Sequence, residues 1–211
     1  MSAYTDQEEL EKLKAWWKNY GGALLIGVLL GLALLFGNKY WTQYKEQQRV
    51  AASELYEQML QQVKESKTGD ARASGEKLIG EYARTPYAGM AALMLARLSF
   101  EANDAAGARR RLEWAEAHAL DPAVAHAARL RLGRLYVAGG EYDAALALAS
   151  KGGPGFEAEY LELKGDAYLG QGKTDDARAA YSDAIQQLPP DSTSRRLLEM
   201  KLEDLGGGKR G

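Results

Sequence analysis

Hydrophobic positions follow two different patterns along the chain. Residues 21–37 form the uninterrupted apolar run GGALLIGVLLGLALLFG. From about residue 46 onward, apolar residues instead recur every three or four positions between short breaks rich in Gly and Asp, which is the period of helices with one buried face. The alternation typical of strands is not sustained anywhere. The sequence therefore predicts an all-α chain in which one apolar helix precedes a helical domain.

The apolar run predicts a single N-terminal transmembrane helix, an anchor over residues 21–41. A helix rises about 1.5 Å per residue, so the run covers roughly 25 Å of a hydrocarbon core that is about 30 Å thick. Amphipathic rings, which favour membrane interfaces, extend it on both sides. They are Trp16, Trp17 and Tyr20 before the run, and Tyr40, Trp41 and Tyr44 after it.

Two other interpretations of the run fit less well. A helix buried in a protein core would leave the aromatic residues at both ends unexplained. A cleaved signal peptide would have a shorter apolar region with a small-residue cleavage site directly behind it, whereas residues 38–41 read NKYW. An uncleaved signal anchor agrees best with the pattern.

Residues 1–20 form a polar leader in front of the anchor. The TDQE sequence at residues 5–8 matches a capping box, and apolar residues then recur at helical spacing as far as Tyr20. The leader is either a short amphipathic helix in the interface or a polar segment that meets lipid only by proximity. Basic residues are balanced across the span, so the positive-inside rule gives no direction. They are Lys12, Lys14 and Lys18 before it, and Lys39, Lys45 and Arg49 after it.

Small residues form one face of the span at Ala23, Gly27 and Gly31. Such a face allows another helix to approach closely, although Gly is also common in transmembrane helices without this role. The run contains no ionisable residue, which argues against a proton relay or an ion path through it.

An internal repeat organises the rest of the chain, and it is clearest over residues 158–190. The small residues Gly165 and Ala177 let two helices approach, tyrosines fill the space around them, and Gly172 makes the turn between them. The offsets are those of a tetratricopeptide unit. The matching residues are Gly165, Tyr168, Gly172, Ala177, Tyr181, Ala184 and Pro189.

Weaker copies of the unit precede this one. Residues 127–149 keep Gly133, Tyr136, Gly140 and Ala145 at the same offsets, and the Gly and Pro residues that follow end the second helix early. A more degenerate helix pair is expected over residues 90–118. Another is expected farther upstream, with its first helix over 46–66, a break at 68–70 and its second helix over 70–84. Residues 192–205 form a final helix that caps the stack. The sequence thus predicts a short tetratricopeptide-like α-solenoid over residues 46–205 and a disordered tail over 206–211.

The first helix of each unit is expected to line a concave groove that could hold a peptide. Basic and apolar residues lie at one end of it and acidic residues at the other. The expected lining residues are Met90, Leu93, Arg97, Phe100, Leu130, Arg134, Val137, Glu159, Glu162, Asp166 and Leu169. In the alternative interpretation, Arg97 and Arg134 pair with neighbouring carboxylates and the face binds nothing.

Composition offers little support for catalysis. The chain has 27 Lys and Arg, 29 Asp and Glu, a net charge of −2 and no Cys, so no basic stripe is left for nucleic acid and no thiol nucleophile exists. His118 and His126 fall outside any metal-ligand spacing and are expected to be surface or packing residues. No phosphate-binding loop or nucleophile elbow is present. We therefore expect no catalytic, cofactor or metal site.

The order of these segments resembles the YfgM family, bacterial ancillary subunits of the Sec translocon. The resemblance rests on the acidic leader that runs into LKAWW at residues 13–17, on the Gly-containing span and on YW at 40–41. It continues through the units around Ala96, Gly133 and Gly165 and ends at MKL at 200–202. It implies a tetratricopeptide-like periplasmic domain on a single-pass protein of the Gram-negative inner membrane, with a cytoplasmic amino terminus.

The resemblance also implies partners. These are the SecYEG translocon and a membrane-anchored periplasmic prolyl-isomerase-like chaperone, so that unfolded client polypeptides are met as they emerge. The first hypothesis is therefore a non-enzymatic accessory chaperone or scaffold in contact with membrane lipid, to which clients bind directly or through the partner. The alternative is a membrane-tethered tetratricopeptide scaffold that faces the cytoplasm and organises a soluble complex.

Overall fold

The structure, a computed structural model, describes residues 3–206, without the side chains of residues 3–9, 13, 23–26, 28 and 30. These residues form nine α-helices and no strand, which confirms the all-α class. The chain divides into two compact units, Met1–Val50 and Ala51–Gly211. The predicted tail falls mostly outside the described residues, and Gly206 is the last residue of a helix.

The first unit is the amino-terminal part of helix α1 (Ala3–Lys64). The predicted leader, anchor and first solenoid helix are therefore parts of one helix, and Thr5 lies inside it instead of capping it. The described apolar side chains of residues 21–37 are exposed. The exposed fractions of Leu34, Leu35 and Phe36 are 74, 70 and 66%. Among the described residues, no helix combines the length and the hydropathy that a membrane crossing requires.

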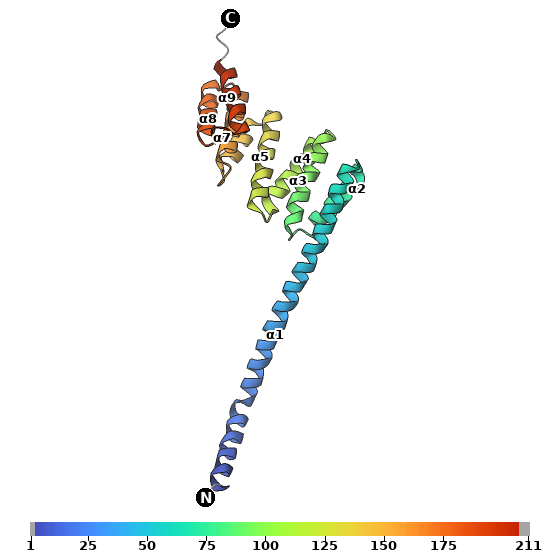
Figure 1. Cartoon of the computed structure of the whole chain (residues 1–211), viewed down its shortest axis with the longest axis vertical. Helices are drawn as coiled ribbons and strands as arrows, with labels where there is room; N and C mark the ends of the chain where they lie inside the picture. The colour runs from blue at the N-terminus through green and yellow to red at the C-terminus, as the bar shows by residue number, and fades with distance from the viewer. Residues whose placement is uncertain (1–2, 207–211) are drawn as a thin grey trace. The chain divides into compact units, whose positions relative to one another are not determined.

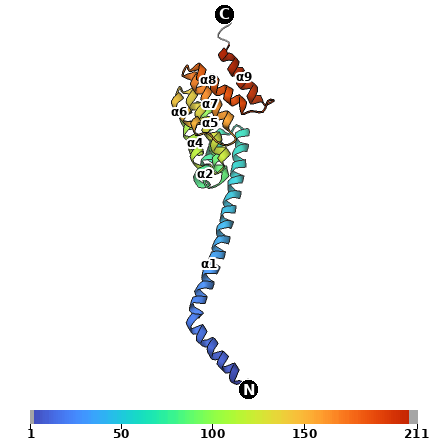
Figure 2. The same cartoon turned by 90° about the vertical axis from the view of Figure 1, so that its left-hand side faces the viewer.

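The second unit contains the end of α1 and eight further helices, arranged as a tetratricopeptide-like stack of helix pairs (Figure 1). Helix α9 lies beside α7 and α8 at one end of this stack (Figure 2). The helices are α2 (Thr68–Glu81), α3 (Pro86–Glu101), α4 (Ala105–His118), α5 (Pro122–Ala138), α6 (Tyr142–Ser150), α7 (Glu157–Gly170), α8 (Thr174–Gln186) and α9 (Thr193–Gly206). Helix α6 is short, as the Gly and Pro residues behind it predicted.

The turn within each helix pair has the same geometry. One residue in each turn has a positive φ, 59° at Ser66 and Asn103, 78° at Gly140 and 76° at Gly172. The next residue donates its N–H to a carbonyl in the last turn of the first helix, which is a Schellman end. These bonds join Lys67 to Gln62, Asp104 to Ser99, Glu141 to Tyr136 and Lys173 to Tyr168 at 2.8 to 2.9 Å. The expected break at residues 68–70 is wrong, because these residues begin α2 and the turn lies at Ser66.

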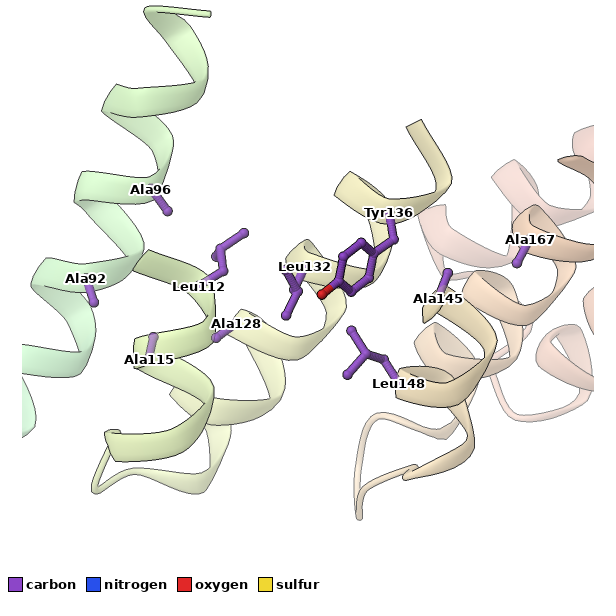
Figure 3. Close-up of a cluster of buried hydrophobic side chains, with 10 residues drawn as sticks. All are labelled: Ala92, Ala96, Leu112, Ala115, Ala128, Leu132, Tyr136, Ala145, Leu148 and Ala167. Atoms are coloured by element: carbon purple, nitrogen blue, oxygen red, sulfur yellow. The ribbon is translucent and has the colours of Figure 1, made fainter. Parts of the chain in front are cut away.

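The central core combines small residues that let helices approach with a few large ones that fill the remaining space (Figure 3). Leu112 of α4 and Leu132 of α5 are 4 and 2% exposed and lie among alanines of α3, α4 and α5. Farther along, Tyr136 and Leu148 pack between α5 and α6. This packing holds α3, α4 and α5 in the positions that shape the site described below.

Several glycines lie in close contacts that a Cβ would disturb, and two of them, Gly165 and Gly133, are equivalent positions of the repeat. A Cβ at Gly165 would overlap the ring of Tyr181 on α8, which confirms the predicted contact between the helices of this pair. A Cβ at Gly133 would overlap Leu163 on α7 instead. The equivalent glycine of α5 therefore serves packing between neighbouring pairs.

Candidate functional site

A cavity of about 400 Å³ lies between α3, α4 and α5 in the second unit. Helix α4 contributes its floor through Ala108 and Leu112. Asp104 caps the start of α4 by accepting a hydrogen bond from the Gly107 N–H at 2.8 Å. Helices α3 and α5 form the two walls. The lining residues are Leu93, Ala96, Arg97, Phe100, Ala108, Leu112, Arg131, Arg134, Leu135 and Ala138.

The cavity has an apolar interior and a basic rim. Ala108 and Leu112 at its base are buried, whereas Phe100 at its mouth is 62% exposed. Arg97 contacts Glu101 on its own helix at 2.7 Å, in an exposed pair of the kind that contributes little to stability. Within residues 3–206, Arg131 forms no ion pair with a described side chain.

Four of the residues predicted for the groove come together here: Leu93, Arg97, Phe100 and Arg134. Two predicted residues of α5 lie elsewhere. Leu130 is 4% exposed in a cluster with Tyr160 and Leu163 of α7, and Val137 packs against the same cluster. Met90 is half-buried on α3 and is not part of the lining.

The shift on α5 follows from the geometry of a repeat. Equivalent residues of successive units face the next unit, so Leu93 on α3 faces α5 and its equivalent on α5, Leu130, faces α7. The wall that α5 contributes to the cavity is its other face. That face carries Arg131, Leu135 and Ala138 together with the predicted Arg134, and the first three were not expected from the sequence.

The predicted acidic end of the groove is closed by the capping helix. Lys201 of α9 donates hydrogen bonds to Glu162 at 2.8 Å and to Asp166 at 2.7 Å. The two carboxylate side chains are only 16 and 24% exposed. Arg134 of α5 lies 3.7 Å from Glu162, so the basic and acidic ends meet at this point. Glu159 is half-buried and Leu169 is 42% exposed on the same helix.

Burial and hydrogen bonding shift two pKa values at this end. Desolvation lowers the pKa of Lys201, but its bonds to Asp166 and Glu162 outweigh that effect and raise it above the ordinary value. Tyr181 is fully buried, and its hydroxyl donates to Asp166 at 2.7 Å. Desolvation and this hydrogen bond both raise the pKa of Tyr181. The cluster therefore favours a protonated Lys201 and a protonated Tyr181.

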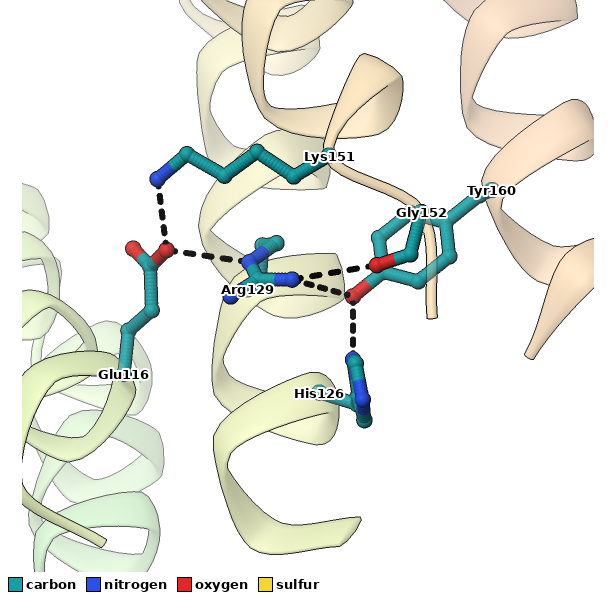
Figure 4. A network of polar contacts seen from close by, with 6 residues as sticks. All are labelled: Glu116, His126, Arg129, Lys151, Gly152 and Tyr160. Carbon is teal, nitrogen blue, oxygen red and sulfur yellow. Dashed lines mark hydrogen bonds and ion pairs between the residues drawn. The ribbon is translucent and has the colours of Figure 1, made fainter. Parts of the chain in front are cut away.

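A second polar network lies between α4, α5 and α7 (Figure 4). Glu116 accepts from Arg129 at 2.9 Å and from Lys151 at 2.8 Å, and Arg129 also donates to the Gly152 carbonyl at 3.1 Å. Desolvation raises the pKa of Glu116, but the two cations outweigh it and hold the pKa below its ordinary value. All these partners come from within the fold, so the network ties the helices together.

The two histidines take part in packing. His126 lies within hydrogen-bond distance of the Tyr160 hydroxyl, at 2.9 Å from Nδ1, and its ring lies 5.0 Å from that of Phe156. His118 stacks on Trp114 with ring centroids 4.9 Å apart. In the part of the chain that the structure describes, no group of three or more His, Asp or Glu residues could hold a metal ion.

The small-residue face predicted on α1 is described in part. A Cβ at Gly27 or Gly31 would meet nothing within 4 Å, so backbone is accessible at both positions in the single chain. The side chain of Ala23 lies outside the described residues.

Comparison with known proteins shows the family of the chain. A family model described as a tetratricopeptide repeat-like domain matches residues 14–207. A protein of Neisseria gonorrhoeae named ancillary SecYEG translocon subunit is 31% identical over 202 residues, which are 95% of this chain and 97% of that protein. The chain belongs to the YfgM family.

Other YfgM-type relatives match to the same extent. The ancillary SecYEG translocon subunit of Escherichia coli is 29% identical over 95% of this chain and 96% of its own length. The ancillary SecYEG translocon subunit of Haemophilus influenzae is 26% identical over 95% of this chain and 97% of its own length. Among solved structures, the kinesin light chain tetratricopeptide-like repeats of Podosopora anserina superpose with a TM-score of 0.54 at 17% identity, over 74% of this chain and 87% of that one. That likeness supports the fold of this YfgM-family chain alone.

Proposed function

We propose that this chain is a non-enzymatic accessory subunit of the Sec translocon that holds segments of other polypeptides in its solenoid. The observation that carries the proposal is the match to ancillary SecYEG translocon subunits over nearly the full length of both chains. The cavity between α3, α4 and α5 supplies the surface for binding, because it combines apolar side chains with charges at the rim.

Residues 21–41 anchor the chain in the membrane, with the leader 1–20 at the interface and the solenoid 46–205 in water. Support for the anchor comes from the uninterrupted apolar run in the sequence and from the exposure of Leu34, Leu35 and Phe36 in the single chain. Exposed apolar surface of this extent is normally covered by lipid or by another protein.

The solenoid faces the periplasm and the amino terminus faces the cytoplasm of a Gram-negative cell. Family membership supports this orientation, whereas the balanced Lys and Arg residues favour neither direction. The test is a pair of fusions to the carboxyl end, alkaline phosphatase and green fluorescent protein. We expect an active phosphatase and a dark fluorescent protein; the reverse pattern would favour a cytoplasm-facing tetratricopeptide scaffold.

Contact with SecYEG is expected through the small-residue face of α1 at Ala23, Gly27 and Gly31. A photoreactive residue in place of Gly27 should crosslink to a channel subunit in cells. The matched control is the same residue in place of Leu29, which lies about 200° farther round the helix and is 64% exposed. Equal crosslinking from both positions would contradict docking through this face.

The second partner is a membrane-anchored periplasmic prolyl-isomerase-like chaperone, with which unfolded clients are shared. Its recovery with the tagged full chain should fall when charge is reversed at the cavity by Arg97→Glu. Arg110→Glu on α4 makes the same change at an exposed residue outside the lining and should leave recovery unchanged. Undiminished recovery with Arg97→Glu would remove the cavity from this interaction.

A further inference from the structure

We propose that the cavity between α3, α4 and α5 selects polypeptide segments in which apolar side chains lie next to carboxylates. The inference rests on the proposed protein-binding function and adds the chemistry of the bound segment. Three observations carry it: the apolar interior of the cavity, the arginines on its rim and the closure of the acidic end of the groove.

The interior accepts an apolar anchor. Leu93, Ala96 and Leu112 present hydrocarbon to a space of about 400 Å³, within the range of roughly 300–1,000 Å³ that is usual for ligand pockets. Phe100 at the mouth is 62% exposed and offers a ring against which an incoming apolar side chain can pack. Burial of such an anchor supplies the affinity.

The rim selects negative charge. Arg97, Arg131 and Arg134 belong to the lining, and an arginine binds a carboxylate through paired hydrogen bonds. Arg131 forms no ion pair with any side chain that the structure describes. Arg97 pairs with Glu101 on its own helix, and the two side chains are 65 and 51% exposed, so a ligand carboxylate can replace Glu101 at little cost. Arg134 lies 3.7 Å from the mostly covered Glu162.

The acidic end of the groove offsets only part of this positive charge, because Glu162 reaches Arg134 alone among the three rim arginines. Glu162 and Asp166 are both bound by Lys201, and their side chains are mostly covered. A basic segment would have to displace this internal ammonium group before it could use either carboxylate. The charged side chains that line the cavity are therefore all cationic, although the sequence pattern predicted a groove with one basic and one acidic end.

The test uses the full chain in an uncharged detergent and three fluorescein-labelled peptides. The first alternates Leu and Phe with Glu, the second has Lys in place of every Glu, and the third has Gln. Fluorescence anisotropy should show the Glu peptide binding at least about tenfold more tightly than the Lys peptide, with the Gln peptide between them. The preference should shrink as salt is raised, because the charges lie at an exposed rim.

Two variants place the binding at this cavity. Arg131→Glu should weaken binding of the Glu peptide by about tenfold and narrow its advantage over the Lys peptide. Arg110→Glu should leave both affinities unchanged, with the helical circular dichroism of both variants equal to that of the parent. An unaltered affinity in Arg131→Glu, or equal binding of the Glu and Lys peptides, would overturn the inference.

Failure of this inference is distinguishable from failure of the proposed function. If none of the three peptides binds, the chemistry assigned to the cavity is wrong, while crosslinking from Gly27 to the channel still reports association with the translocon. If the crosslink is absent but the Glu peptide binds, the cavity stands and the translocon role falls.

Discussion

The two clefts on either side of α5 are built from equivalent repeat positions, but different side chains occupy them. Between α5 and α7, Leu163 is 1% exposed and packs into the space above Gly133. At the equivalent position between α3 and α5 the chain has Arg131, which is exposed and lines the cavity. At this position of the repeat, leucine packs into the cleft between α5 and α7, whereas arginine lines the cavity between α3 and α5.

The largest effect is expected when the side chain that fills the cleft between α5 and α7 is truncated. Leu163→Ala should lower the free energy of unfolding by about 2–5 kcal/mol, because it removes buried methyl groups and leaves a cavity above Gly133. Urea unfolding followed by circular dichroism measures the change. Leu169→Ala on the same helix, at a residue that is 42% exposed, should cost about 1 kcal/mol or less. Equal costs would mean that α5 and α7 do not depend on this contact.

The next largest effect on stability is expected at the acidic cluster, where Lys201 binds Glu162 and Asp166. Lys201→Met should lower the free energy of unfolding by about 1–3 kcal/mol, because the mostly covered Asp166 would lose its cation and Glu162 would keep only Arg134. Lys164→Met, on α7 but outside this cluster, serves as the control. If Lys201→Met is as stable as Lys164→Met, hydration of the two carboxylates replaces the ammonium group without loss of stability.

The same cluster predicts loss of stability at high pH. Folding raises the pKa of both Lys201 and Tyr181, so the folded state holds protons that the unfolded state releases above about pH 10. Their stabilising effect is complete below that pH and is lost as the pH rises toward the folded pKa values. Unfolding midpoints measured from pH 8 to 11 should fall more steeply in the parent than in Tyr181→Phe. Parallel curves would contradict the linkage.

The smallest effects are expected in the four equivalent turns. Gly140 has a φ of 78°, so Gly140→Ala should cost about 1 kcal/mol, since a Cβ is strained in the left-handed region. Asn103 has a φ of 59°, so the parent residue is already strained in the left-handed region. Asn103→Gly should therefore be neutral or stabilising by about 0.5 kcal/mol. In thermal melts, the midpoint of Gly140→Ala should fall, whereas that of Asn103→Gly should stay unchanged or rise. Equal shifts would show that the turns are not equivalent.

Local patterns predicted the fold well. The spacing of small residues and tyrosines identified the pair α7–α8, including the contact of Gly165 with Tyr181, because those residues are close in sequence and meet within one pair. The turn at Ser66 was missed, since serine carries no strong signal for a left-handed residue. Two equivalent turns use glycine and were found easily.

The candidate site was harder to predict because it forms between units. Leu130 and Val137 have the apolar character of groove residues, but only the stacking of α5 on α7 shows that they are buried there. Arg131 looks like any exposed basic residue until α3 and α5 are placed side by side. Lys201 lies far from Glu162 and Asp166 in the sequence, and helical periodicity carries no information about such pairs.

Lys201 also has a consequence for the order in which the solenoid is completed. A stack of helix pairs that contact mainly their neighbours can fold progressively from one end. Until α9 has folded, Asp166 lacks its cation and Glu162 has only Arg134, and the hydroxyl of Tyr181 donates to an unneutralised carboxylate. The pair α7–α8 thus gains its full stability only when α9 docks. During synthesis, which proceeds from the amino terminus, the solenoid should therefore become fully resistant to proteolysis only after α9 has folded.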